Sequence, residues 1–147
     1  MPEQERNLEH KRAEYAFKCI SEIIELKNPK YEAQYRSVAL SSGVLIQKSG
    51  LMQALAFYIS KKEHHKKLAE HILKWIQCPG INVELQFQCL LNISDEDMVR
   101  KTMETRDFIS WLKRFAEGRL RKEEDNVIIT SGNSQEKVEQ NVNNTGL

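Results

Sequence analysis

Residues 8–26, LEHKRAEYAFKCISEIIEL, decide the fold class. On a helix that turns about 100° per residue, the apolar side chains of this stretch fill about half of the circumference. They are Leu8, Ala13, Tyr15, Ala16, Phe17, Cys19, Ile20, Ile23, Ile24 and Leu26. Such a wide apolar surface needs at least two neighbouring elements to cover it. The stretch therefore predicts a first helix, over about residues 5–27, in a bundle of several helices.

The next segment carries signals for the start and the end of a second helix. Asn28 is expected to cap it, with Pro29 at its first position. Tyr31, Tyr35 and Val38 mark a buried stripe. The run Ser41-Ser42-Gly43 is expected to bend or break the helix, because all three residues have low helix propensity.

Four further helices follow from the same periodicity. Residues 51–62, LMQALAFYISKK, are apolar almost all round and predict a central helix buried by its neighbours. Further helices are expected over about residues 63–77 and 83–91. Ser94 begins a capping-box-like SDED motif, which predicts a last helix that runs to about Lys122.

The fold expected is all-α: a single compact bundle of about five to six helices over residues 1–125. The chain has three prolines and six glycines among 147 residues, and no convincing run of alternating β-branched residues. Residues 126–147 are rich in Asn, Ser, Gln and Gly, lack aromatic residues, and are expected to form a disordered polar tail.

Composition limits the classes of function. The 22 Lys and Arg against 21 Asp and Glu leave a net charge of +1, so nucleic-acid binding would depend on where the cations lie. No apolar run approaches the ~20 residues that span a bilayer, and no signal peptide is recognisable. A cytoplasmic location, without membrane contact, is expected. The three cysteines are expected to be buried thiols in a reducing compartment.

Catalytic and metal-binding motifs are not found in the sequence. No glycine-rich phosphate loop, GxSxG elbow or HExxH motif occurs, so the chain is predicted not to be an enzyme and to need no cofactor. His64, His65 and His71 with Cys78 lack the paired spacing of a metal site, so incidental surface histidines are expected.

The last helix carries the clearest candidate for a nucleic-acid contact. From Met98 to Lys122, eight Lys and Arg face three Asp and Glu, a local net charge of +5. Arg100, Arg106, Arg114 and Arg121 lie away from the predicted core side, with Lys113 at the margin. A basic stripe of this kind can follow RNA phosphates. It is also typical of a solvated helix face with pairs such as Lys113 and Glu117.

Other cations are candidates for different reasons. Lys61 belongs to the KKEHHKK run at 61–67, where cations either bind phosphate or match the helix dipole. Arg12 falls inside the apolar arc of the first helix, so its guanidinium must reach solvent, pair with a carboxylate, or contact RNA or a neighbouring subunit. Arg36 is an equal candidate for an interface or RNA contact, and Lys48, just before Gly50, is a weaker one.

Three stretches carry a family resemblance. They are LEHKRAEYA at 8–16, YRSVALSSGVLIQKSGLMQALAFYISK at 35–61 and TMETRDFISWLKRFAEG at 102–118. In order and spacing, over about residues 8–120, the chain resembles the small subunit of the type III-B CRISPR Cmr effector complex. Gly43 stands where that family often has proline, and residues 77–97 match poorly.

The resemblance implies a helical, non-catalytic subunit of an RNA-guided antiviral effector. Small subunits of this family stack as an inner filament beside the backbone subunits and line the groove that holds guide and target RNA. The RNA-binding residues are then expected to be Arg12, Arg36, Lys48, Lys61, Arg100, Arg106, Lys113, Arg114 and Arg121. The alternative is a helical protein–protein adaptor whose basic face meets an acidic partner. An RNA-processing enzyme has least support.

Overall fold

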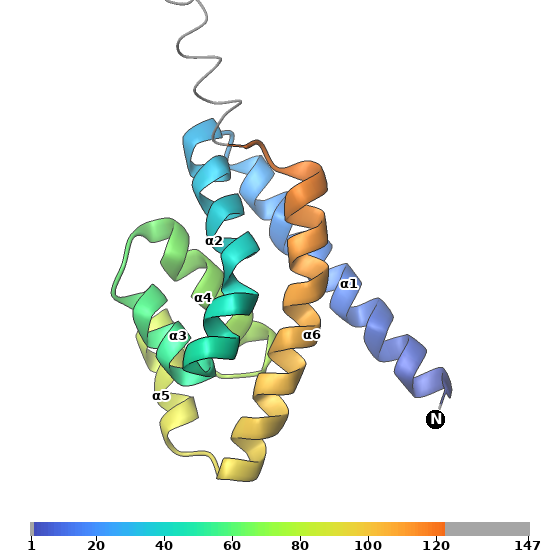
Figure 1. Ribbon diagram of the computed structural model, residues 1–147, viewed down its shortest axis with the longest axis vertical. Helices are drawn as coiled ribbons and strands as arrows, with labels where there is room; N and C mark the ends of the chain where they lie inside the picture. The colour runs from blue at the N-terminus through green and yellow to red at the C-terminus, as the bar shows by residue number, and fades with distance from the viewer. Residues whose placement is uncertain (1, 123–147) are drawn as a thin grey trace, which may run out of the picture.

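The computed structural model describes residues 2–122, with side chains from Asn7 onward. In this part of the chain six helices and no strand form, which confirms the all-α expectation (Figure 1). The predicted tail at 126–147 lies outside the described residues. The helices are α1 (Pro2–Glu25), α2 (Pro29–Ser49), α3 (Leu51–Ile59), α4 (Glu63–Trp75), α5 (Val83–Leu91) and α6 (Asp95–Arg119).

The three longest helices form one side of the bundle. α6 packs along both α1 and α2, and the first turns of α1 extend beyond the other helices (Figure 1). α4 packs against α2, α3 and α5 on the other side. The wide apolar arc of α1 thus meets two helices, as predicted, although Phe17 at its margin stays 46% exposed.

Local side-chain caps set the helix starts. The Asn28 side chain accepts a hydrogen bond from the Tyr31 N–H (3.2 Å), and the Ser94 hydroxyl accepts one from the Asp97 N–H (3.1 Å). Both predicted caps are confirmed. Between α2 and α3 the chain turns at Gly50, whose φ of 85° is strained for any residue with a Cβ.

Of the bend or break expected at Ser41-Ser42-Gly43, the break does not occur, because α2 stays helical through all three residues. The Ser42 hydroxyl donates to the Ala39 carbonyl (2.7 Å), one turn earlier, and so adds no competing structure. Gly43 lies against α6, where a Cβ would come 3.9 Å from Ile109 Cγ2. Packing between α2 and α6 offsets the low propensity of the run.

The prediction that α3 is a central, fully surrounded helix is also wrong. Leu51, Ala54, Leu55 and Tyr58 are buried, but Phe57 is 44% exposed. α3 packs on α2, α4 and α5 and leaves its other side open. An apolar residue on a surface is common in folded proteins, so an all-apolar pattern does not prove burial on every side.

The histidines correct the expectation of incidental surface positions. His71 is 2% exposed, with Nδ1 2.6 Å from Tyr35 Oη and Nε2 2.8 Å from Glu22 Oε2. His64 is buried as well, at 7% exposure. Hydrogen bonds to residues of other helices offset the cost of burying the His71 imidazole. The local sequence does not reveal these partners. Of the cysteines, Cys19 and Cys78 are buried and Cys89 is half-buried, all as free thiols.

Candidate nucleic-acid interface

The exposed side of α6 carries three cations that pair with no carboxylate among the described side chains. Arg106, Lys113 and Arg114 are exposed, and among the residues with described side chains none of them has an ion-pair partner. The Lys113–Glu117 pair that would mark an ordinary solvated face does not form there. Arg106 and Lys113 are seven residues apart, about 11 Å along the helix axis. The three charges therefore extend along about two helical turns.

The beginning of α6 differs from its middle. Arg100 is exposed, but its guanidinium lies 3.5 Å from the Asp97 carboxylate. Val99 and Met103, on the same outer side, are 59% and 61% exposed. This part of the surface is therefore mixed in character, with apolar side chains between partly neutralised charges.

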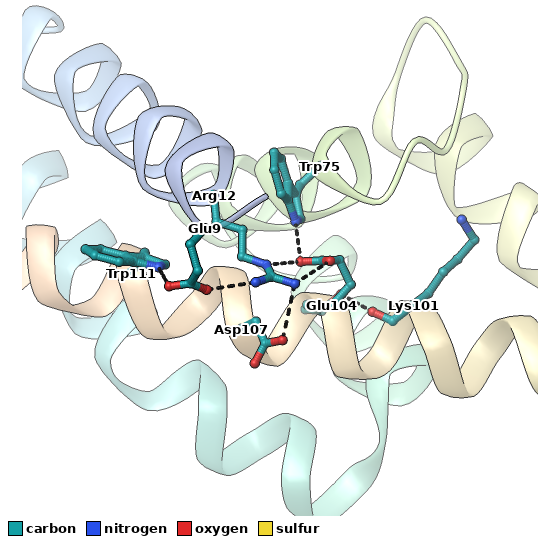
Figure 2. A network of polar contacts seen from close by, with 8 residues as sticks. Glu9, Arg12, Trp75, Lys101, Glu104, Asp107 and Trp111 are labelled. Carbon is teal, nitrogen blue, oxygen red and sulfur yellow. Dashed lines mark hydrogen bonds and ion pairs between the residues drawn. The ribbon is translucent and has the colours of Figure 1, made fainter. Parts of the chain in front are cut away.

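Arg12 belongs to a polar network that joins three helices (Figure 2). Its Nε and Nη2 donate to the two carboxylate oxygens of Glu104, at 2.5 and 2.9 Å, and its Nη1 donates to Glu9 (2.7 Å). The indole N–H of Trp75 donates to Glu104 (3.2 Å), and that of Trp111 to Glu9 (3.1 Å). Of the possibilities open for Arg12, the structure shows the carboxylate pairing.

The electrostatics of this network favour the charged forms of both partners. The hydrogen bond to Glu104 outweighs burial and raises the pKa of Arg12. Burial would raise the pKa of Glu104, but the hydrogen bonds from Arg12 and Trp75 lower it below its ordinary value. The Arg12 side chain is only 12% exposed, so its donors are committed inside the protein.

Arg121 does not share the α6 face, which corrects the predicted arrangement. The helix ends at Arg119, and Leu120 is already extended. The Arg121 backbone N–H donates to Glu32 (3.2 Å), and its guanidinium Nε lies 3.5 Å from the same carboxylate oxygen. A helical wheel drawn past the true end of the helix put Arg121 on the wrong surface.

The remaining predicted residues lie elsewhere. Lys61 follows α3 with its Nζ 4.8 Å from the centre of the Phe57 ring, and Lys48 is exposed in the last turn of α2. Arg36 is half-buried on α2, and its buried Nε has no hydrogen-bond partner in the described part of the chain. The structure thus groups Arg100, Arg106, Lys113 and Arg114 on α6 and separates the other five.

Sequence reasoning missed a second basic feature beside the network. A hollow of about 440 Å³ is lined by Trp75, by the cations Lys11, Arg100 and Lys101, and by Glu104, which pairs with Arg12. Lys11 was not among the predicted RNA-binding residues. Its proximity to α6 depends on how α1 crosses that helix, which no local pattern reveals.

Two observations bear on the chemical class of the protein. In residues 2–122 no helix is long and apolar enough to cross a membrane. In the same part of the chain no group of three or more His, Cys, Asp or Glu side chains is arranged to hold a metal ion.

Comparison with known proteins agrees with the resemblance seen in the sequence. A sequence model of the Cas_Cmr5 family of CRISPR-associated proteins matches residues 8–119. A Cmr5 family protein from Thermus thermophilus has a similar structure, with a TM-score of 0.65 and 28% sequence identity. The match covers 75% of this chain and 97% of that protein. The chain therefore belongs to the Cas_Cmr5 family of CRISPR-associated proteins and is a small subunit of a type III-B CRISPR complex.

Proposed function

We propose that this subunit stacks with copies of itself and with backbone subunits, and lines the groove in which guide and target RNA pair. The observation that carries the proposal is the exposed side of α6, where Arg106, Lys113 and Arg114 have no carboxylate partner among the described side chains. A phosphate backbone can bind such cations without first breaking an ion pair. Arg12 and Arg121 already pair with carboxylates, so we do not expect them to bind RNA phosphate.

The subunit's role is to position RNA and not to cleave it. Two carboxylates on α6 support this role, because Glu104 is held by Arg12 and Asp107 lies 3.5 Å from the same guanidinium. A general base needs a carboxylate that can accept a proton from substrate or water. These two are engaged in holding α1 to α6.

Stacking makes weak contacts of each copy effective. One subunit presents only a few unpaired cations, so a free copy should bind RNA weakly. Adjacent copies add further contacts to the same strand, and each becomes effectively intramolecular once the first has formed. Sequence selection is left to guide pairing, as in other guided effectors.

One observation favours the adaptor alternative. Val99 and Met103 are exposed on the outer side of α6, close to Arg100. Exposed apolar side chains between charges are typical of a protein contact. The first turns of α6 are therefore the place where a neighbouring subunit would be met under either proposal.

The test is target-RNA binding by reconstituted complex over a salt series. Lys113→Gln/Arg114→Gln is compared with Lys27→Gln/Lys30→Gln, which removes two exposed cations at the α1–α2 turn. The α6 variant should bind all targets more weakly, with the slope of log affinity against log salt reduced by about one for each phosphate that is no longer bound. The control should match wild type. An unchanged affinity and slope in the α6 variant would remove α6 from the groove.

A further inference from the structure

A separate polar hollow lies where α2 passes the start of α4. Its volume is about 320 Å³, at the small end of the roughly 300–1,000 Å³ usual for ligand sites. Apart from Val38, every lining side chain is polar: Gln34, Ser37, Lys61, Lys62, His64 and His65. Two of these side chains are cationic and none is acidic.

The backbone at the start of α4 offers free donors beside this hollow. Lys62 occupies the N-cap position and makes no side-chain cap hydrogen bond. Its carbonyl accepts from the His65 and Lys66 N–H groups, each at 3.0 Å. The N–H groups of Glu63 and His64 have no hydrogen-bond partner within the described chain. Uncapped N–H groups and the positive end of the helix dipole favour an anion at this position.

A buried imidazole in the lining is an independent indication of a ligand. His64 is 7% exposed, and its ring lies against the rings of Tyr31 and His65 without a hydrogen bond to any described residue. His65 Nδ1 is also buried without a partner. Buried polar groups in folded proteins are nearly always hydrogen-bonded, so His65 Nδ1 is an exception at this hollow. The largely buried His64 ring beside it lines the hollow and has hydrogen-bonding capacity left for a partner outside the chain.

The charges around the hollow indicate that a ligand there would be negatively charged. Burial and the neighbouring charges lower the pKa of both His64 and His65. Glu63 lines a different hollow, on the α5 side of α4, and is not among the residues that line this one. An anion here would satisfy the backbone donors and compensate Lys61 and Lys62 together.

We propose that this hollow binds a phosphate group, held by the N–H groups of Glu63 and His64, the His64 imidazole and the Lys62 ammonium. The site deepens the proposed function and rests on it in one respect, since an RNA backbone would supply the phosphate in the complex. A free phosphate or a nucleotide offers the same chemistry. The site is distinct from the α6 cations, because its residues come from α2, α4 and the turn before α4.

The test is an NMR titration of the full chain with inorganic phosphate, a nucleoside monophosphate and a short single-stranded RNA. The amide signals of Glu63 and His64 should shift and saturate with all three phosphate sources if RNA phosphate fits the site. Lys62→Gln should weaken phosphate binding about three- to fivefold, and the exposed control Lys30→Gln should leave it unchanged. His64→Gln, which keeps one polar group, should weaken it as well and provides a second variant.

The outcomes separate the two proposals. No saturable shift at Glu63 and His64, or equal affinity in Lys62→Gln and wild type, would overturn the phosphate site, whatever the α6 variant does. Saturable phosphate binding that is weakened by Lys62→Gln supports the site, even if neutralising Lys113 and Arg114 leaves target capture unchanged and the α6 proposal fails. Shifts with free phosphate or nucleotide but none with RNA would support the site and assign it to a soluble ligand.

Discussion

The Arg12 guanidinium and the Glu104 carboxylate form a bidentate ion pair, with N–O distances of 2.5 and 2.9 Å. The two residues are 92 positions apart in the sequence. The pair ties α1 to α6 (Figure 2). Because Trp75 of α4 donates to the same carboxylate, three helices are fixed in one place. The position of the α6 surface relative to α1 depends on this contact.

Removing Arg12 should destabilise the fold more than removing an exposed arginine would. Arg12→Ala leaves the partly buried Glu104 carboxylate without its hydrogen-bonding partner, which should cost about 1–3 kcal/mol of unfolding free energy. Arg12→Lys should recover only part of the loss, since an ammonium lacks the forked geometry. The measurement is urea unfolding.

The matched control for that pair is Lys18→Ala, which removes the exposed pair between Lys18 and Glu14. Its cost should stay within about 0.5 kcal/mol. Equal effects of Arg12→Ala and Lys18→Ala would show that the network does not stabilise the fold.

Two glycine substitutions should have opposite signs. Gly50→Ala should destabilise by about 1 kcal/mol, because φ is 85° there and no neighbour lies within 4 Å to add a clash. Gly43→Ala should stabilise by about 0.5–1 kcal/mol, because Gly43 is helical and a Cβ would only touch Ile109. Thermal unfolding of both variants provides the comparison, and a destabilised Gly43→Ala would contradict the continuous α2.

Leucine and phenylalanine on α3 should differ in their contributions to stability. Leu55 is fully buried, so Leu55→Ala should cost about 2–5 kcal/mol. Phe57 is 44% exposed, so Phe57→Ala should cost clearly less. Equal losses in chemical denaturation would mean that α3 is surrounded after all.

Acid should destabilise the protein in two stages. Burial lowers the pKa of His71, so the folded state keeps this imidazole neutral while the unfolded chain takes up a proton below about pH 6.5. The hydrogen bond from His71, together with Lys67, lowers the pKa of Glu22 to about 2, so its contribution is lost as the pH falls below about 4.5. Both effects make stability rise with pH.

The unfolding free energy measured from pH 8 to pH 3 tests this linkage. His71→Gln should flatten the first stage, leaving the smaller contribution of His64 and His65, whose pKa values burial also lowers. A variant with the same slope between pH 7 and pH 5 as wild type would show that His71 is not the linked group.

Most of the helices could be predicted because caps and apolar periodicity involve residues within one or two turns of each other. The caps at Asn28 and Ser94 and the bounds of α5 needed no knowledge of distant residues. No local signal singled out Phe108, which is fully buried, 5.4 Å from the Tyr15 ring centre and 5.6 Å from that of Trp75. A wheel drawn for one buried side misses it, since α6 is covered by two helices.

The sequence predicted which cations lie on α6, but not which of them lack a carboxylate partner. Arg106, Lys113 and Arg114 follow from the periodicity of α6 alone. Whether a cation is available depends on carboxylates that the fold brings close, such as Glu104 beside Arg12 and Glu32 beside Arg121. Those pairings join residues about 90 positions apart, which a single sequence does not reveal.

The most direct measurement places a photo-crosslinker on the α6 surface and identifies whether it crosslinks to RNA or to protein. Ser110 is exposed and lies one turn from both Arg106 and Arg114, so p-benzoylphenylalanine at this position samples the proposed groove. Gln53, exposed on α3, is the control position. In reconstituted complex with labelled guide and target, crosslinks from position 110 should reach RNA, and those from position 53 should not. Crosslinks from position 110 to protein alone would contradict the RNA-lining role and favour the adaptor.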